Sequence, residues 1–245
     1  MKVAFVGATK GMGRSLSRLM AERGDRLFLL GRDAAEMAKA AADLKVHGAA
    51  GEVGSAHCDL LDAATLEPAL EAADAALEGF DCLVITAGLF ATQEELEADA
   101  ALRERVLTAN FTNTIQLCEA ARLRLLGRGG GTLVVFSSVA GDRARKPVIL
   151  YGATKAGLSH YLNGLDHKFR AQGLKTVLVK PGFVKTGMTA GLPPPPFAGE
   201  PDDVARTVLK AIDAGKPQVY APPIWQLVML AIRSLPRAVM RKIGF

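Results

Sequence analysis

The chain has 245 residues, of which 49% are hydrophobic and 22% are charged, and its formal net charge is +5 at pH 7. This length and composition indicate one large globular domain and argue against a disordered chain. No run reaches the ~18 apolar residues that a bilayer-spanning helix needs. The basic residues are scattered and no aromatic-basic module occurs, so no nucleic-acid partner is expected.

Three cysteines, an odd number without a C-x-x-C pair, lie near apolar segments at Cys58, Cys82 and Cys118. We expect buried free thiols, as in a reducing compartment, and neither disulfides nor a metal site. A strand is predicted to begin at Lys2, so no signal peptide is expected. Together these features predict a cytoplasmic protein.

Short apolar runs alternate with helical segments from residue 1 to about residue 220. Strands are predicted near 2–6, 26–30, 53–57, 81–85, 131–137, 174–179 and 217–220. Helices are predicted near 11–24, 34–48, 62–78, 93–127, 152–171 and 202–214. Such alternation implies right-handed crossovers and a parallel sheet covered on both faces. We therefore predict an α/β fold with one doubly wound, seven-stranded, Rossmann-type sheet over residues 1–221, with 222–245 as a tail of the same domain.

A glycine-rich run follows the first predicted strand and precedes the first predicted helix. Glycine lets the backbone turn tightly and approach a pyrophosphate, and the helix offers free N–H groups to the phosphates. The spacing is G-x-x-x-G-x-G, which gains its meaning from this position between strand and helix. The predicted cofactor-binding residues of this run are Gly7, Thr9, Lys10, Gly11 and Met12.

The second predicted strand ends in Leu30-Gly31-Arg32-Asp33. At this place an acidic side chain receives a ribose 2′-hydroxyl, whereas an arginine receives a 2′-phosphate. Arg32 comes first and Lys10 adds positive charge, so the sequence predicts NADP(H). Asp33 has two readings, a ribose contact or a helix N-cap. Glu36, three residues later, completes a capping-box pattern that favours the N-cap.

Two later strand ends carry further candidates. Asp59 and Leu60 follow the third predicted strand, in reach of an adenine ring. Ala87 and Gly88 follow the fourth, where small residues let the backbone lie against a cofactor. An ordinary turn is the alternative at both places.

Tyr151 and Lys155 lie four residues apart in the helical run YGATKAG, so their side chains share one face. An ammonium beside a phenol favours the phenolate and lowers the pKa of the phenol, which suits a general acid or base. Ser138 closes the apolar run LVVFSS, where its hydroxyl can hold a carbonyl oxygen. The alternative is a chance Tyr–Lys pair on an ordinary helix.

With these residues in place, the chain resembles the short-chain dehydrogenase/reductases over nearly its whole length. The matching positions are Gly7, Gly11, Gly13, Asp59, Leu60, Ala87, Gly88, Asn110, Ser138, Tyr151, Lys155, Pro181 and Gly182. The chain departs from the family pattern at Val6, where threonine is frequent, and at Thr86, where asparagine is usual. Both positions are supporting ones, so the departures question local geometry and not activity.

The resemblance implies a role for each catalytic candidate. Tyr151 would donate the proton in a reduction, and Lys155 would lower its pKa and hold the nicotinamide ribose. Ser138 would orient the substrate oxygen, and Asn110 would anchor a water that relays protons toward Lys155. Residues lining the nicotinamide side would be Pro181, Gly182, Val184 and Thr186.

A finer likeness is to the decaprenylphosphoryl 2-keto-ribose reductases, which act on a lipid-linked sugar. It rests on the stretch SSVAGDRARKPVILYGATKAGL and on the tail KPQVYAPPIWQLVMLAIRSLPRAVMRK. In the first stretch, the charges of the loop 142–146 are placed to meet a substrate phosphate, although a solvated loop is the alternative. Leu89, Phe90, Phe183, Met188 and the proline-rich segment 187–200 are candidates for an apolar wall or lid.

The tail combines the apolar run IWQLVMLAI with Arg233, Arg237, Arg241 and Lys242, and has no acidic residue after Asp213. Pro236 should split its helix. Trp225 and the basic face suit a helix lying peripherally at the inner face of a membrane. The alternative is that the tail covers the core or a subunit interface.

The sequence thus predicts an NADPH-dependent carbonyl reductase for a small or lipid-linked hydrophobic substrate, which the resemblance implies to be a homo-oligomer. The alternatives are a 3-ketoacyl or general ketone reductase and, from another class, a non-catalytic NADP-binding regulator. The complete set of Asn110, Ser138, Tyr151 and Lys155 argues against the regulator.

Overall fold

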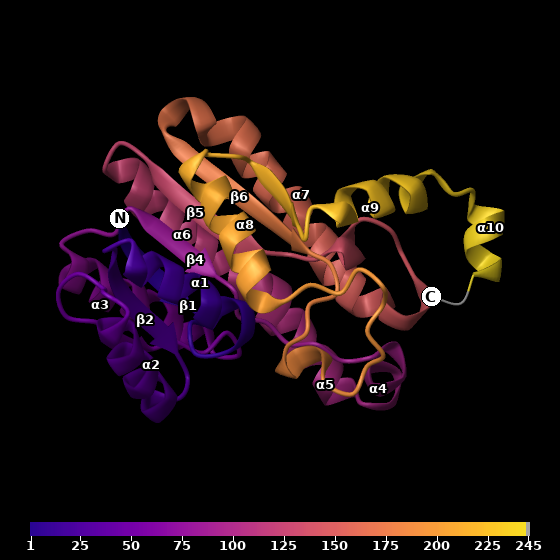
Figure 1. Ribbon diagram of the computed structural model, residues 1–245, viewed down its shortest axis with the longest axis horizontal. Coiled ribbons are helices and arrows are strands. Elements are labelled where there is room, and N and C mark those ends of the chain that lie inside the picture. The colour runs from indigo at the N-terminus through magenta and orange to yellow at the C-terminus, as the bar shows by residue number, and fades with distance from the viewer. Residues whose placement is uncertain (244–245) are drawn as a thin grey trace.

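The computed structural model describes residues 1–243 and shows one sheet flanked by helices (Figure 1). Seven parallel strands are arranged in the order β3-β2-β1-β4-β5-β6-β7. They are β1 (Lys2–Val6), β2 (Arg26–Gly31), β3 (Gly54–His57), β4 (Cys82–Ile85), β5 (Gly131–Phe136), β6 (Leu174–Pro181) and β7 (Gln218–Ala221). This confirms the predicted fold class and all seven strands.

Successive residues of a strand point to opposite faces of the sheet and belong to two separate hydrophobic layers. Val3 and Phe5 of β1 pack with helices α1 (Gly11–Glu22), α2 (Ala34–Val46) and α8 (Pro201–Asp213) on one face. Ala4 and Val6 pack with α3 (Leu66–Leu77), α6 (Asn113–Gly127) and α7 (Ile149–Phe169) on the other. Both faces of the sheet are therefore covered, as the near-continuous apolar strands require.

The predicted helix over 93–127 is wrong as a single element. It divides into α4 (Gln93–Ala98), α5 (Ala100–Leu107), a π-helical turn (Thr108–Thr112) and α6. Asp99 causes the first break, because its carboxylate accepts hydrogen bonds from the backbone N–H groups of Ala101 and Leu102 and so caps a new helix. The helix predicted from residue 152 begins three residues earlier, at Ile149.

The C-terminal segment forms α9 (Ile224–Ser234) and α10 (Arg237–Lys242), separated at Pro236 as predicted. Trp225 and Met229 are buried with Val139 and Tyr220. The prediction that Trp225 sits at a membrane surface is therefore wrong, because its indole packs on the protein and its Nε1 donates to the Phe197 carbonyl at 3.1 Å. No described helix has the length and apolar character to cross a bilayer.

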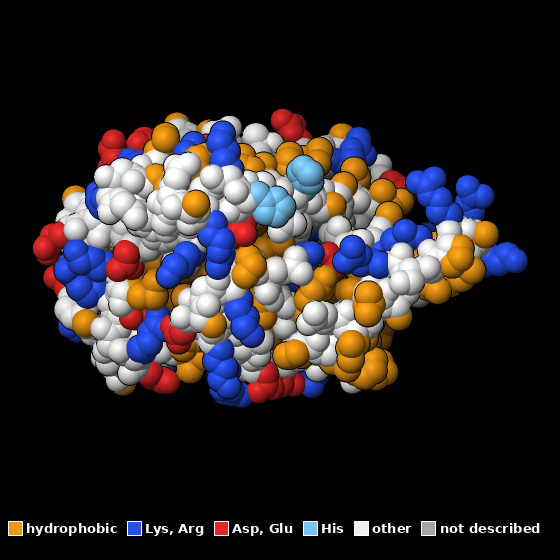
Figure 2. Space-filling model, turned by 90° about the horizontal axis from the view of Figure 1, so that it is seen from above, with side chains coloured by type: hydrophobic (Ala, Val, Ile, Leu, Met, Phe, Trp, Pro, Cys, Tyr) orange, Lys and Arg blue, Asp and Glu red, His pale blue; other side chains and the backbone are white. Residues whose placement is uncertain are grey.

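Other residues of the tail remain on the surface. Leu227 and Leu230 are 65% and 63% exposed, and the arginines and the lysine of the tail are exposed as well. Figure 2 shows the tail projecting from the body, with basic side chains along one edge and apolar side chains along the other. The tail thus both covers the core and presents an amphipathic surface.

Candidate active site

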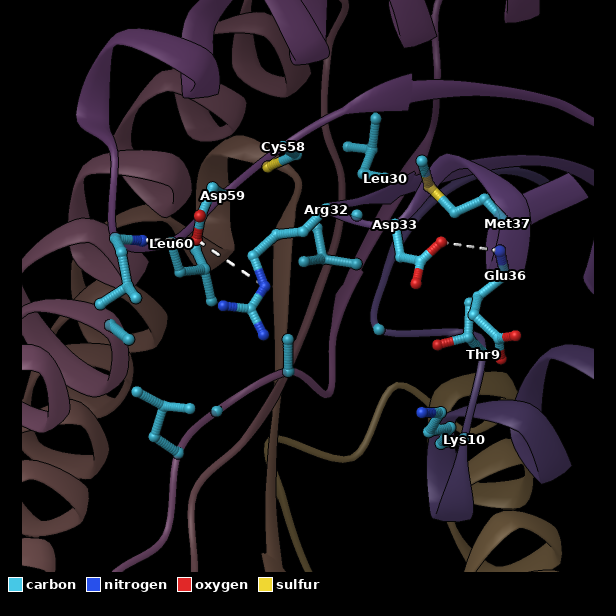
Figure 3. A pocket seen from close by; sticks show the side chains of 18 residues that line it. Thr9, Lys10, Leu30, Arg32, Asp33, Glu36, Met37, Cys58, Asp59 and Leu60 are labelled. Carbon is cyan, nitrogen blue, oxygen red and sulfur yellow. Dashed lines mark hydrogen bonds and ion pairs between the residues drawn. The ribbon is translucent and has the colours of Figure 1, made fainter.

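The carboxyl ends of the central strands meet at one edge of the sheet. Val6 of β1 pairs with Leu30 of β2 and with Ile85 of β4, so the residues that follow these three strands come together. The strand order reverses between β1 and β4, which is where ligands bind in open parallel sheets. A cavity of about 300 Å³ opens there (Figure 3). Its lining includes the predicted residues Gly7, Thr9, Lys10, Arg32, Asp59, Leu60, Ala87 and Gly88.

The glycine loop is tightly folded under this cavity. Gly7 has φ +92°, a left-handed conformation that glycine adopts without strain. A Cβ on Gly13 would collide with the Gly7 carbonyl oxygen. Thr86 holds the loop, since its hydroxyl donates to the carbonyls of Val6 and Gly7, with O···O distances of 3.2 and 2.9 Å. The departure at Thr86 thus preserves the local geometry.

Helix α1 begins directly after this loop without a side-chain cap. Lys10 is its N-cap residue and makes no capping hydrogen bond, and the first turn carries no acidic residue. The N–H groups of the first turn are therefore available to an anion. The side chain of Met12 is partly buried and packs against the core on the α1 side of the sheet, which leaves its backbone N–H in the first turn.

The end of β2 is positively charged toward the cavity. Arg32 lies with its Nε 4.0 Å from Asp59 Oδ1, and its side chain is 55% exposed. Asp33 is the N-cap of α2, and its carboxylate accepts from the Glu36 N–H at 3.0 Å (Figure 3). This confirms the N-cap reading. The reciprocal half of the capping box is absent, because Glu36 pairs with Lys39 at 2.9 Å instead.

Gly88 connects the nucleotide end of the cavity with the catalytic candidates. A Cβ on Gly88 would lie 3.0 Å from Asn110 Oδ1 and 3.6 Å from Lys155 Nζ. Asn110 is buried in the π-helical turn, and its amide both donates to and accepts from the backbone of Leu89 at 2.7 Å. Asn110 therefore fixes the chain beside Lys155, and π-turns of this kind are frequent at functional sites.

Ser138, Tyr151 and Lys155 form the inner end of the site. Ser138 ends the segment after β5, and its Oγ accepts from the Ala140 N–H at 3.1 Å. Lys155 is buried, and its Nζ donates to the Phe136 carbonyl at 3.1 Å and lies 5.7 Å from the centre of the Tyr151 ring. Phe90, one of the predicted wall residues, meets that ring edge-on at 5.1 Å.

The protonation states differ from the prediction. Burial raises the pKa of Tyr151 to about 12, against opposing effects of a hydrogen bond with Ser138 and the charge of Arg145. Burial also lowers the pKa of Lys155 to about 8. In the protein by itself burial thus outweighs the lowering effects of Ser138 and Arg145, so the net pKa of Tyr151 is raised, whereas the sequence led us to expect a lowered one.

In the loop between Ser138 and Tyr151, three charged side chains contact three different parts of the protein. The Asp142 carboxylate binds Lys180 Nζ and the Tyr220 hydroxyl, each at 2.7 Å. Arg143 Nη2 donates to the Leu235 carbonyl at the end of α9, at 2.7 Å. Only Arg145 turns to the catalytic residues, where its charge acts on Tyr151. The idea of a uniformly solvated loop is therefore wrong.

The segment after β6 reaches the same site from the other side. A Cβ on Gly11 would lie 3.3 Å from Thr186 Cγ2, so Thr186 adjoins the glycine loop. Val184 is buried and bridges to Gly199, which closes the base of the proline-rich segment. Pro181 ends β6. Gly182 has a different use, since a Cβ there would collide with the Trp225 indole.

The residues present suit a dinucleotide with a phosphate-bearing ribose. The glycines leave room for its pyrophosphate, the uncapped helix end faces it, and Arg32 and Lys10 supply positive charge. Beyond Gly88, a protonated phenol and a serine hydroxyl lie together beside a buried amine. Such a set can hold a carbonyl oxygen and give it a proton. The fold and the site define a dinucleotide-binding enzyme of the parallel α/β class.

Comparison with known proteins agrees with this class. The family model described as short chain dehydrogenase matches residues 2–195. An uncharacterized oxidoreductase of Mycobacterium tuberculosis is 33% identical over 242 residues, covering 98% of this chain and 96% of the relative. Carbonyl reductase family member 4 of Xenopus tropicalis is 29% identical over 223 residues, covering 86% and 90%.

A solved short-chain dehydrogenase from Sphingobium yanoikuyae in complex with NADPH superposes with a TM-score of 0.82 and 25% identity, covering 97% of this chain and 98% of that one. The present chain belongs to the short-chain dehydrogenase family.

Sequence reasoning missed two contributors to the site. Thr86 was treated as a departure, although its hydroxyl at the end of β4 is well placed to hold the glycine loop. Gln93 was not singled out, yet its Oε1 accepts from the Leu150 N–H at 3.1 Å and so caps the start of the helix that carries Tyr151. An apolar strand ending in a hydroxyl residue was the available signal for Thr86, and nothing in the sequence pointed to Gln93.

Proposed function

We propose that this protein is an NADP(H)-dependent carbonyl reductase in which Tyr151 donates the proton. The observation that carries the proposal is the position of Gly88, which ends the nucleotide cavity and adjoins both Asn110 and Lys155. A nicotinamide cofactor supplies the hydride when bound. The chain's own part is to hold the carbonyl oxygen with Ser138 and to deliver the phenolic proton.

The preference for NADP(H) is supported by the charges at the end of β2. Arg32 is exposed toward the cavity, while one carboxylate oxygen of Asp33 accepts the N-cap hydrogen bond from Glu36. The relative solved with NADPH supports the same choice. We expect kcat/KM to be higher with NADPH than with NADH.

Replacing Arg32 by alanine tests the cofactor preference directly. Removing a charge-assisted contact to a phosphate should cost about 1.5–3 kcal/mol, or roughly 10- to 150-fold in kcat/KM for NADPH. The value for NADH should stay within about threefold. Equal losses with both cofactors, or a wild-type preference for NADH, would contradict the assignment.

The catalytic assignment is tested by Tyr151→Phe, with Tyr161→Phe as its control on the same helix. Loss of a general acid costs about 10²- to 10⁴-fold in kcat. Tyr161 instead donates to Glu119 at 2.6 Å, away from the catalytic residues, and its replacement should leave kcat within about threefold. NADPH oxidation with a panel of ketones is the assay. A Tyr151→Phe enzyme as active as wild type would refute Tyr151 as the acid, whereas a wild type that oxidises no NADPH with any ketone would favour the non-catalytic regulator.

A hydrophobic substrate is supported by the apolar groups around Tyr151. Phe90 touches the tyrosine ring. Elsewhere, Met188, Leu192 and Phe197 of the segment that follows Thr186, the residue adjoining the glycine loop, expose further apolar side chains. Among hydrophobic substrates we propose a polyprenyl-phosphate-linked keto-sugar, in keeping with the finer sequence likeness. A 3-ketoacyl chain or another ketone is the alternative, and the higher kcat/KM in a side-by-side assay decides between them.

We also propose that the exposed face of the tail contacts anionic lipid, and that the protein is a cytoplasmic homo-oligomer. The lipid contact is supported by exposed Leu227 and Leu230 beside the basic side chains of α9 and α10, an arrangement typical of interfacial helices. Deleting the tail would also remove buried Trp225, so point variants are the better test.

The test compares Leu227→Gln/Leu230→Gln with Leu123→Gln, a control leucine on α6 that is also 63% exposed. Vesicles of phosphatidylglycerol and phosphatidylcholine should retain the wild type and the control but lose the double variant. Equal recovery of all three in the supernatant would end the lipid proposal. A change in light-scattering mass confined to the double variant would instead assign the face to a second copy of the chain.

A further inference from the structure

Arg145 lies in the loop before Tyr151, and its side chain makes no hydrogen bond or ion pair with any of residues 1–243. Its Nε is buried and makes no hydrogen bond, a situation that carries a desolvation cost. Tyr151 is the one titratable group whose charge acts on it. Arg145 as a whole is half-buried, but its Nε–H is shielded from solvent. A buried N–H normally has an acceptor, so this donor is prepared for an acceptor that is not part of the described chain.

The neighbouring charges are already used elsewhere. Asp142, the nearest acidic residue in sequence, binds Lys180 and Tyr220 and is itself buried. Arg143 is tied to the Leu235 carbonyl and so serves the tail. Of the loop's two arginines, Arg145 is therefore the one whose side chain makes no hydrogen bond to the described residues, and its charge acts on Tyr151.

The position of Arg145 in the chain indicates which part of a substrate it would contact. It precedes the short turn Lys146–Val148 that leads into α7, only six residues before Tyr151. Phe90 packs on the tyrosine ring and supplies an apolar contact at the same mouth. A molecule whose carbonyl meets Tyr151 thus has an arginine and an aromatic ring within reach of its next atoms.

We propose that Arg145 is a specificity-determining residue that binds an anionic group, a carboxylate or a phosphate, close to the carbonyl of the substrate. This inference rests on the proposed function, since it deepens the description of the same site. The planar guanidinium suits both anions, because each accepts paired N–H donors. Neutral ketones would leave this buried donor unsatisfied and would be poorer substrates.

The experiment uses substrate pairs that differ in charge. Benzoylformate and its methyl ester form the carboxylate arm, and dihydroxyacetone phosphate and dihydroxyacetone form the phosphate arm. In the wild type, the charged member of at least one pair should have the higher kcat/KM. The arm with the larger ratio identifies the anion.

Arg145→Gln should lower kcat/KM for the charged member by roughly 10- to 150-fold, mainly through KM, because a hydrogen bond to a charged group is lost. The neutral member should lose much less, because any effect of Arg145 on the Tyr151 acid is shared by both members and cancels in their ratio. Arg105→Gln is the matched control, since Arg105 is exposed on α5 and removes the same charge. Arg145→Lys should recover part of the loss, which keeps the test informative if the glutamine variant is unstable.

Three results would overturn the inference: equal losses for both members of a pair, equal effects of the Arg145 and Arg105 variants, or a wild-type preference for the neutral members. A calorimetric titration of the protein–NADP⁺ complex with benzoylformate and with dihydroxyacetone phosphate gives a readout without turnover. Weaker binding by Arg145→Gln supports the site even if no carbonyl is reduced. Active reduction without any charge preference refutes Arg145 and leaves the proposed function standing.

Discussion

Replacing Lys155 by methionine should make the protein inactive and, at neutral pH, more stable. Lys155 is only 5% exposed, and burial lowers the pKa of its ammonium from 10.5 to about 8. That difference corresponds to about 3 kcal/mol by which folding disfavours the charged form. The variant also loses the hydrogen bond to the Phe136 carbonyl, worth about 1 kcal/mol. The net gain at pH 7 is therefore about 2 kcal/mol.

The sign of this effect depends on pH. Below pH 8 the amine is charged in both states, so the folded wild type carries the full cost. Between pH 8 and 10.5 the unfolded chain binds more protons than the folded one, so this group's contribution to stability rises with pH. Above 10.5 both states are neutral and the cost is gone. The advantage of Lys155→Met should therefore vanish and turn into a deficit of about 1 kcal/mol, the lost hydrogen bond.

The assay is urea unfolding of nucleotide-free protein at pH 7 and at pH 10, at one protein concentration. Burial raises the pKa of the Cys58 thiol to about 11 and those of Cys82 and Cys118 further, so the wild type loses stability from these groups at high pH. Comparing variant with wild type at each pH cancels that loss. Lys168→Met, an exposed lysine of the same helix, is the control and should stay within about 0.5 kcal/mol. A stability difference that is the same at both pH values would refute the reasoning.

Two further substitutions probe the packing around the site. Gly182→Ala forces a methyl group into the Trp225 indole and should lower the free energy of unfolding by about 1–3 kcal/mol in thermal or urea unfolding. Gly187→Ala is the control and should be near neutral, because the added atom meets nothing within 4 Å. Equal effects of the two substitutions would contradict the packing. Asp142→Ala leaves the buried Lys180 ammonium unpaired and should lower the free energy of unfolding by about 3–5 kcal/mol. Adding Lys180→Met should restore more than half of that stability. If the second substitution restored none of it, the buried ion pair would be contradicted.

The sequence predicted what is decided locally. Six of the seven strands follow from apolar runs, and β3, with the sequence GSAH, follows from its place in the alternation of strands and helices. The N-cap at Asp33 follows from its spacing to Glu36, and the split of the tail from Pro236. The break at Asp99 was missed because the run 93–127 has helix-favouring composition throughout. An aspartate within such a run is decided by whether its carboxylate finds the next two N–H groups, and composition does not reveal that.

Features that depend on contacts between residues far apart in the sequence were not predictable. Trp225 lies on an apolar helix with two usable faces, and its burial depends on Gly182, a residue on another element that leaves space for the indole. Arg143 and Arg145 are two residues apart, yet one binds the tail and the other lies beside Tyr151. Spacing placed Lys155 beside Tyr151 correctly, but the pKa values are set by how deeply the fold buries both groups.

The raised pKa of Tyr151 changes how its chemistry is understood. A phenol with a pKa of about 12 is protonated at neutral pH, so it is ready to donate to a carbonyl, whereas about one molecule in 10⁵ holds the phenolate needed to oxidise an alcohol at pH 7. Burial raises the pKa of Tyr161 and Tyr220 as well, and the chain has no other tyrosine. The absorbance of the nucleotide-free protein at 295 nm should therefore stay flat up to pH 10. A step equal to one phenolate below pH 9, absent in Tyr151→Phe, would show that the neighbouring lysine outweighs burial and that the phenol is acidic before any cofactor binds.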